Sequence, residues 1–211
     1  MATSKPARRA ATLGAIAIVL TAAAAVPLIL GAGSSRARPT DTAIDTRPSG
    51  AFWWLHPGLP PAGWQQTTTA TSQATLFYPP GWKAIPGDKG TATRSLRASS
   101  GLYVGYLNVT PQQGTEQLHG WAAFRIDHNQ EEGDKHVRQV AADESLTFTD
   151  AHGSCVIDDY LSKVASNPYR EIACLVTGHN HSDVFIGAAL KRDWPTLSRS
   201  IERAASAFAQ R

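Results

Sequence analysis

The sequence predicts an α+β fold, in which an antiparallel sheet of about six or seven strands is covered by two main helices and preceded by an N-terminal transmembrane helix. Three observations lead to this prediction. After residue 73, strand-like runs are separated by short turn segments, and short connections favour antiparallel pairing. Two longer stretches carry apolar residues at helical spacing. An uncharged run of 21 residues near the N-terminus is long enough to span a bilayer.

The N-terminal span is predicted at residues 10–30, because a helix of this length measures roughly 30 Å, the thickness of a hydrocarbon core. Basic residues before the run favour a cytoplasmic N-terminus. Residues 1–33 are therefore expected to be a cytoplasmic tip and an anchor of a single-pass protein of the cell membrane, with the C-terminal domain outside the cytoplasm. Small residues at 31–33 leave a second interpretation open, in which the segment is a cleaved signal and the protein is secreted.

The composition suits a folded domain that does not bind nucleic acid. Hydrophobic residues make up 42% of the 211 residues and charged residues 18%, which is enough for a core. The chain holds 20 Lys and Arg against 17 Asp and Glu, but Lys5, Arg8 and Arg9 supply the whole excess. Without them the remaining chain is neutral, and nucleic-acid binding needs clustered positive charge.

Residues 34–72 are expected to form a flexible linker that contains Pro, Thr and Trp. Within it, the segment AFWWLHPGLPPAGW at residues 51–64 allows two interpretations. Trp53 and Trp54 form an aromatic latch at the membrane interface or on a partner, or the rings of this segment cap the core of the domain itself. Thr67 to Ser72 is expected to be a polar spacer.

The extracytoplasmic domain is predicted to occupy residues 73–211. Each strand is expected where branched and aromatic residues lie between Gly, Pro, Ser or Asn, which interrupt sheet pairing. The predicted strands are 73–78, 90–98, 101–109, 136–149, 154–163, 169–177 and 184–190.

Two helices complete the domain. The first is expected at residues 115–132, with Thr115 as its N-cap, Glu116 in its first turn and Gly133 just after its end. The second begins at Asp193, and its apolar stripe must be buried against the sheet. That stripe consists of Leu197, Ile201, Ala204, Ala205 and Phe208.

The two cysteines, Cys155 and Cys174, are expected to form a disulfide, because they lie on consecutive strand candidates of an extracytoplasmic domain. If they face each other directly, the same register aligns Ile157 with Ile172, Asp159 with Arg170 and Tyr160 with Tyr169. Each pair is chemically complementary, which favours this register. The alternative is a pair of free, buried thiols.

The hexapeptide FYPPGW at residues 77–82, followed by paired strands, a helix, a long meander and a closing helix, resembles the Mog1/PsbP-like superfamily. The resemblance covers roughly residues 64–211. That superfamily includes photosystem extrinsic subunits and secreted bacterial lipoproteins, most of which act as assembly or binding modules rather than as enzymes. The resemblance therefore implies a binding or assembly role.

Polar groups gather around the first helix and the strand before it, and if the two pack together these groups can line one ligand cleft. The other interpretation is structural: Asn108 and Thr110 satisfy loop backbone, and Arg125 ties the helix down. The candidate cleft residues are Tyr106, Asn108, Thr110, Arg125, Asp127 and His128.

The sequence thus predicts a membrane-anchored extracytoplasmic binding or assembly module that is not catalytic and carries neither metal nor cofactor. Its expected partners are the membrane, through residues 10–30, and an envelope protein. The α/β-hydrolase motif G-x-S-x-G and phosphate-binding glycine loops are missing from the sequence. The alternative is a cell-envelope hydrolase that uses His128 with Asp127 or Glu131.

Overall fold

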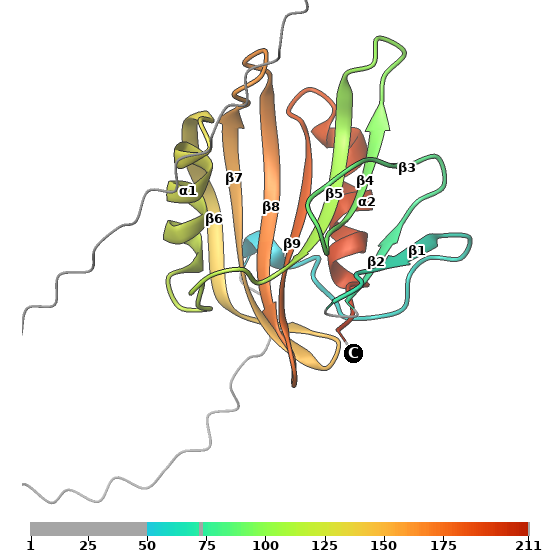
Figure 1. The fold of residues 1–211 in the computed structure, drawn as a ribbon, viewed down its shortest axis with the longest axis vertical. Coiled ribbons are helices and arrows are strands. Elements are labelled where there is room, and N and C mark those ends of the chain that lie inside the picture. The colour runs from blue at the N-terminus through green and yellow to red at the C-terminus, as the bar shows by residue number, and fades with distance from the viewer. Residues whose placement is uncertain (1–49, 72–73, 211) are drawn as a thin grey trace, which may run out of the picture. The chain divides into compact units, whose positions relative to one another are not determined.

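The computed structural model describes residues 50–71 and 74–210. Within this part of the chain, seven strands form one antiparallel sheet, in the order β3-β4-β5-β9-β8-β7-β6 (Figure 1). Their bounds are β3 (Lys83–Ala84), β4 (Ala92–Arg97), β5 (Tyr103–Pro111), β6 (Lys135–Phe148), β7 (Ala151–Leu161), β8 (Pro168–Thr177) and β9 (Ser182–Leu190).

The other elements are two helices, a short 3-10 turn and a small hairpin. They are η1 (Gly50–Phe52), β1 (Gln65–Thr68), β2 (Thr75–Tyr78), α1 (Trp121–Glu131) and α2 (Trp194–Ser206). The predicted α+β class, with two main helices on an antiparallel sheet, is confirmed for the described residues. The expected transmembrane span lies outside them, and no helix among them is both long and apolar enough to cross a membrane.

The two helices pack on opposite faces of the sheet, because alternate residues of a strand point to opposite sides. On one face, Trp121 of α1 packs with Val156 of β7 and Ala173 of β8. On the other face, Ile201 of α2 lies so close to β9 that a Cβ at Gly187 would collide with it. We call these the α1 face and the α2 face.

The α2 face carries the larger apolar core of the domain. Phe52, Leu55, Leu76 and Phe208 pack there with the disulfide and with Ile201 in one buried cluster. On the α1 face, by contrast, the helix lies over β6 and β7 and leaves β5 and β9 without a helix above them (Figure 1). This uncovered half of the sheet carries the candidate site.

The register predicted from the cysteines is confirmed. Cys155 and Cys174 are disulfide-bonded cross-strand partners with their Cα atoms 4.1 Å apart. The other three predicted pairs are also aligned: Ile157 with Ile172, Asp159 with Arg170, and Tyr160 with Tyr169.

The first helix starts later than the sequence predicts, at Trp121 rather than after Thr115. Gly120 has a left-handed backbone, with φ of 81°, and its N–H donates to Glu144 of β6. The Glu116 carboxylate accepts a hydrogen bond from the Gly114 N–H. Because these local bonds satisfy the backbone outside a helix, the chain forms a loop before α1. The end of the helix and Gly133, with φ of 98°, agree with the prediction to within a residue.

The domain begins before the predicted boundary at residue 73. Phe52 and Leu55 lie in the core of the α2 face, and β1 pairs with β2, so the described residues of the expected linker belong to the fold. Trp54 packs against this core, as the core-capping interpretation requires, whereas Trp53 is 68% exposed. Thr67 and Thr68, at the start of the expected polar spacer, belong to β1, which pairs with β2 and is mostly exposed. Residues 34–49 of the expected linker lie outside the described residues.

Candidate functional site

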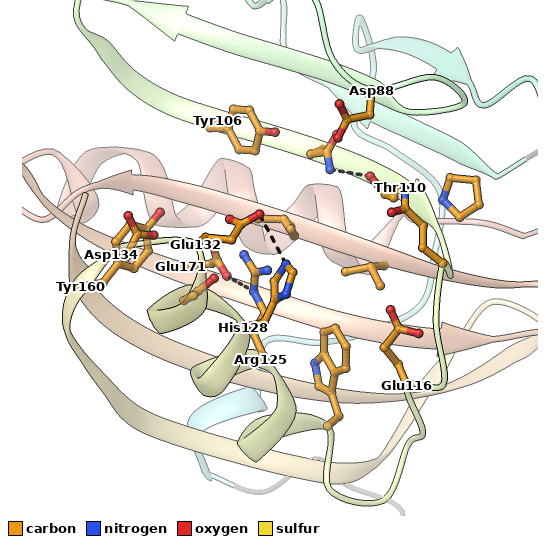
Figure 2. Close-up of a pocket in the computed structure, with 17 residues that line it drawn as sticks. Asp88, Tyr106, Thr110, Glu116, Arg125, His128, Glu132, Asp134, Tyr160 and Glu171 are labelled. Atoms are coloured by element: carbon orange, nitrogen blue, oxygen red, sulfur yellow. Dashed lines mark hydrogen bonds and ion pairs between the residues drawn. The ribbon is translucent and has the colours of Figure 1, made fainter. Parts of the chain in front are cut away.

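A cavity of about 380 Å³ lies on the α1 face, where the helix leaves β5 and β9 uncovered (Figure 2). We call it the acidic cavity. Its walls come from β5, α1, β7, β8 and β9, from the loop between β3 and β4, and from the loops before and after α1. Its lining includes Tyr106, Asn108 and Thr110 from β5, Arg125, His128 and Asn129 from α1, Glu171 from β8, and Val184 and Ile186 from β9.

Acidic side chains dominate this lining. Five carboxyl groups line the cavity, against one guanidinium group and one imidazole. Three of the acids, Glu116, Glu132 and Asp134, stand on the α1 side of the opening, and Asp88 stands on the opposite side (Figure 2). The fifth, Glu171, is buried.

Arg125 and Glu171 form a buried ion pair, with Arg125 Nε donating to Glu171 Oε1 at 2.8 Å. Arg125 is 9% exposed and Glu171 is 2% exposed. Burial alone would lower the pKa of Arg125, but the adjacent Glu171 carboxylate raises it above its ordinary value. The single guanidinium group in the cavity lining is therefore neutralised by Glu171. Among the described residues, the lining holds no second arginine or lysine to neutralise the other four carboxyl groups.

A second buried acid lies beside Glu171. Asp158 of β7 is its direct cross-strand partner, so the two side chains share the α1 face. Asp158 is 0% exposed, and neither of its carboxyl oxygens has a hydrogen-bond partner. Burial, together with the nearby Glu171 carboxylate, raises the pKa of Asp158 to about 8. Asp158 is thus mostly protonated at neutral pH, and the buried pair carries about one negative charge.

Asn129 gives the cavity an unused hydrogen-bond donor. The side chain is 1% exposed and lines the cavity, and its Nδ2 atom has no partner. A buried amide without a partner costs free energy, so such groups are uncommon in folded proteins. Asn108 differs: its Oδ1 accepts from Thr93 at 2.8 Å, and its Nδ2 donates to Thr110 at 2.9 Å.

The structure brings together five of the six residues that the sequence proposed for a cleft: Tyr106, Asn108, Thr110, Arg125 and His128. The sixth, Asp127, is exposed on α1 and does not line the cavity. The structural interpretation of Arg125 also holds, because its ion pair joins α1 to β8. That a ligand occupies the cavity stays a prediction.

His128 is not paired as the hydrolase alternative requires. Its Nε2 atom lies 3.5 Å from Glu132 Oε1, and its ring stacks on Phe124 with centroids 5.9 Å apart. Asp127 and Glu131, the two proposed partners, are exposed and do not line the cavity. The carboxylate that does lie near His128 belongs to Glu132, at i+4 on the same helix face.

Sequence reasoning missed the buried acids, although a signal for them was present. The register that aligns Asp159 with Arg170 also places Asp158 opposite Glu171. Acids at facing positions of two apolar strands, such as Asp158 and Glu171, are unusual. Acidic residues are seldom buried without a function or a partner.

A second groove adjoins the acidic cavity. It measures about 460 Å³ and shares Tyr106, Asp134 and Tyr160 with the cavity. Tyr160 stacks on Tyr169 with ring centroids 5.8 Å apart, and the Tyr169 hydroxyl donates to the Tyr103 carbonyl at 2.7 Å. Burial raises the pKa of Tyr106 and Tyr160, so both phenols are neutral at ordinary pH. We call this the tyrosine groove.

Asp159, on the α2 face, belongs to a separate ion-pair network. Its carboxylate accepts from Arg170 at 2.8 Å, Lys191 at 3.0 Å and Arg138 at 3.0 Å. Burial alone would raise the pKa of Asp159, but the hydrogen bonds from Arg170 and Lys191 hold it below its usual value. This network ties β6, β8 and the end of β9 to β7 and has a structural role.

No protein-family model and no curated protein matches the chain. Solved structures do resemble it. Cyanobacterial PsbP from Synechocystis sp. PCC 6803 matches with a TM-score of 0.51 and 14% identity, over 73% of this chain and 96% of the other. PA94 from Pseudomonas aeruginosa, described as a putative regulator, matches with a TM-score of 0.47 and 11% identity, over 70% of this chain and 97% of the other. LpqN, involved in cell-envelope biogenesis in Mycobacterium tuberculosis, matches with a TM-score of 0.44 and 12% identity, over 70% of this chain and 90% of the other. The likeness to PsbP shows that this chain has a PsbP-like fold.

Proposed function

We propose that this chain is a membrane-tethered extracytoplasmic binding module whose ligand occupies the acidic cavity. The observation that carries the proposal is the cavity itself, with Asn129 Nδ2 buried in its wall and left without a protein partner. Concave sites with a few converging polar groups are where small ligands bind. The PsbP-like fold supports a non-catalytic role only as an analogy.

The charged groups at the cavity floor also favour binding over catalysis. A catalytic group must reach the reacting atoms, and Asp158, whose pKa is shifted to about 8, is 0% exposed. Arg125 and Glu171 are held by each other at 2.8 Å. Groups that are buried or held in an ion pair in this way are poorly placed to transfer protons to a ligand.

A cavity-filling variant tests the binding proposal. Ile186→Trp places a ring into the cavity from β9, whereas Val140→Trp places the same ring at a site 40% exposed on β6, outside the cavity. Full-length protein would be screened by thermal shift against amines, sugars, organic acids and lipids. We expect at least one compound to raise the Tm of the wild type and of Val140→Trp but not of Ile186→Trp. If every stabilising compound acts equally on Ile186→Trp, the cavity is not the binding site.

We further propose that residues 10–30 stay in the membrane and hold the domain in an oxidising compartment. The disulfide between Cys155 and Cys174 supports this location, because disulfides persist mainly outside the cytoplasm. In membranes from the native host, we expect the protein to remain after an alkaline carbonate wash and its thiols to react with maleimide only after reduction. Recovery from the culture medium would support signal cleavage instead, and alkylation without reduction would contradict the location. An envelope protein partner stays a prediction.

A further inference from the structure

The charge balance of the acidic cavity selects the sign of its ligand. Arg125 is already neutralised by Glu171, which leaves Asp88, Glu116, Glu132 and Asp134 around the opening. Among the described lining residues, His128 is the one other group that can carry positive charge, and it pairs with Glu132. An anion entering the cavity would meet repulsion from these carboxylates, whereas a cation would be attracted.

The polar groups of the lining indicate that the ligand must supply both donors and acceptors. The carboxylates of Asp88, Glu116, Glu132 and Asp134 accept hydrogen bonds and therefore favour a ligand with N–H donors. Asn129 lines the cavity, and its buried Nδ2 atom lacks an acceptor. A ligand with a charged N–H group next to a carbonyl or hydroxyl oxygen matches the acidic lining and the free amide donor together.

This requirement favours an organic cation over a metal ion. Nδ2 of Asn129 is an N–H donor, and a donor repels a bare cation instead of coordinating it. In residues 50–71 and 74–210, no three His, Cys, Asp or Glu side chains are grouped closely enough to hold a metal ion. The carboxylates are spread around the cavity, as is suited to an extended ligand.

The adjoining tyrosine groove provides a place for the body of such a ligand. Tyr103, Tyr106, Tyr160 and Tyr169 all line it, and Tyr106 and Tyr160 also line the acidic cavity. Tyrosine faces attract cations and stack on rings, and neutral phenols can do both. A ring attached to an ammonium group would therefore contact the tyrosines while its charge lies among the carboxylates.

We propose that the acidic cavity and the tyrosine groove together bind a small organic cation, in which a protonated amine lies next to a hydrogen-bond acceptor and a ring. The inference rests on the proposed function, that the cavity binds a ligand, and adds the chemical class of that ligand. It gives Glu132 and Asp134 the role of recognising the ammonium and Asn129 the role of donating to the neighbouring acceptor, with Tyr106 and Tyr160 at the junction with the ring.

The test uses full-length protein and two matched probes in isothermal titration calorimetry. Phenylalaninamide carries an ammonium, a carbonyl and a ring, whereas N-acetylphenylalaninamide has the same ring without the charge. We expect the charged probe to bind at least about tenfold more tightly than the neutral one, because the carboxylates recognise the ammonium. Calcium chloride serves as the metal probe and is expected neither to bind in the cavity nor to displace the amine.

Matched variants locate the binding. Glu132→Gln and Asp134→Asn are each expected to weaken the charged probe roughly fivefold. Glu131→Gln removes the neighbouring carboxylate of α1, which does not line the cavity, and is expected to change the affinity by less than about twofold. Asn129→Leu should weaken binding without lowering the Tm of the ligand-free protein, because it removes a donor that has no partner in the fold.

Four results would overturn the inference. They are lack of binding by phenylalaninamide, equal binding of the neutral probe, equal effects of Glu131→Gln and Glu132→Gln, and displacement of the amine by calcium. In each case the screen with Ile186→Trp still decides independently whether the cavity binds anything, so failure of the cation and failure of the binding module remain distinguishable.

Discussion

Asp158 is the residue whose protonation the fold controls most strongly. Burial beside Glu171 raises its pKa to about 8, whereas an unfolded aspartate has a pKa of about 3.9. The folded state therefore holds a proton that the unfolded state releases. The stability that this proton provides is complete below about pH 4 and is lost as the pH rises through about 8.

We expect the free energy of unfolding to fall between about pH 5 and pH 8, by up to about 1.4 kcal/mol per pH unit. Asp158→Asn cannot ionise and should flatten this part of the curve, with its largest gain over the wild type near pH 8. Urea unfolding of the wild type and of Asp158→Asn at several pH values measures the two curves. If the variant keeps the wild-type slope, another group carries the proton, and Glu171→Gln then tests the neighbouring acid.

The ion pair between Arg125 and Glu171 is also a residue-scale feature with a measurable signature. Removing one partner leaves a charge buried without compensation, so Arg125→Met is expected to destabilise the fold by about 3–5 kcal/mol. Replacing both, with Arg125→Met and Glu171→Leu, should recover most of that loss. Urea unfolding of the two single variants and the double variant completes the cycle. A double variant as unstable as Arg125→Met would show that the pair does not act as a unit.

At the scale of single residues, the sequence identified five of the residues that line the cavity but not Asn129 or Glu171. Tyr106 and Thr110 could be placed in a cleft because polar residues next to a helix are visible in the sequence. Asn129 was missed because only the position of α1 against the sheet decides which helical amide is buried. Asp127 was included because adjacency in sequence does not give adjacency on a helix face.

Among the elements, β7 and β8 are the most strongly joined, by the disulfide and by ten aligned residue pairs. The cross-link closes a loop with a sequence separation of 19. Replacing Cys155 and Cys174 with alanine together should lower the free energy of unfolding by about 3 kcal/mol in the chain-entropy model. Denaturation with and without a reductant measures this loss of stability. The reductant should lower the free energy of unfolding of the wild type and leave that of the double variant unchanged. Equal stability of the two proteins would contradict a structural role for the bond.

The elements also show which signals in the sequence were sufficient. The pairing of β7 with β8 was predictable because apolar, charged and aromatic pairs all agreed on one register. The short strands β1 and β3 were missed, since a mostly exposed strand carries no alternating apolar pattern. The start of α1 was misplaced because Gly120 and the bond to Glu144 depend on β6, which follows later in the chain.

For the whole molecule, the N-terminal border of the domain has a direct test. Phe52 and Leu55 are 0% and 2% exposed in the α2-face core, so a fragment that lacks them exposes that core. Loss of a large buried side chain costs about 2–5 kcal/mol. We expect a fragment of residues 50–211 to unfold cooperatively on heating and a fragment of residues 73–211 to have a much lower Tm or no transition. Equal Tm values by circular dichroism would place the border at residue 73.

The two faces of β7 contribute to different parts of the molecule: one face contributes to the core, and the other contributes to the acidic cavity. Cys155 and Ile157 point into the core of the α2 face, whereas Tyr160 lines the acidic cavity on the other face. A substitution at position 160 can therefore change the surface offered to a ligand while positions 155 and 157 preserve the core. Tolerance to substitution along β7 should consequently be greatest at position 160, because Val156 and Asp158 on the same face are themselves fully buried.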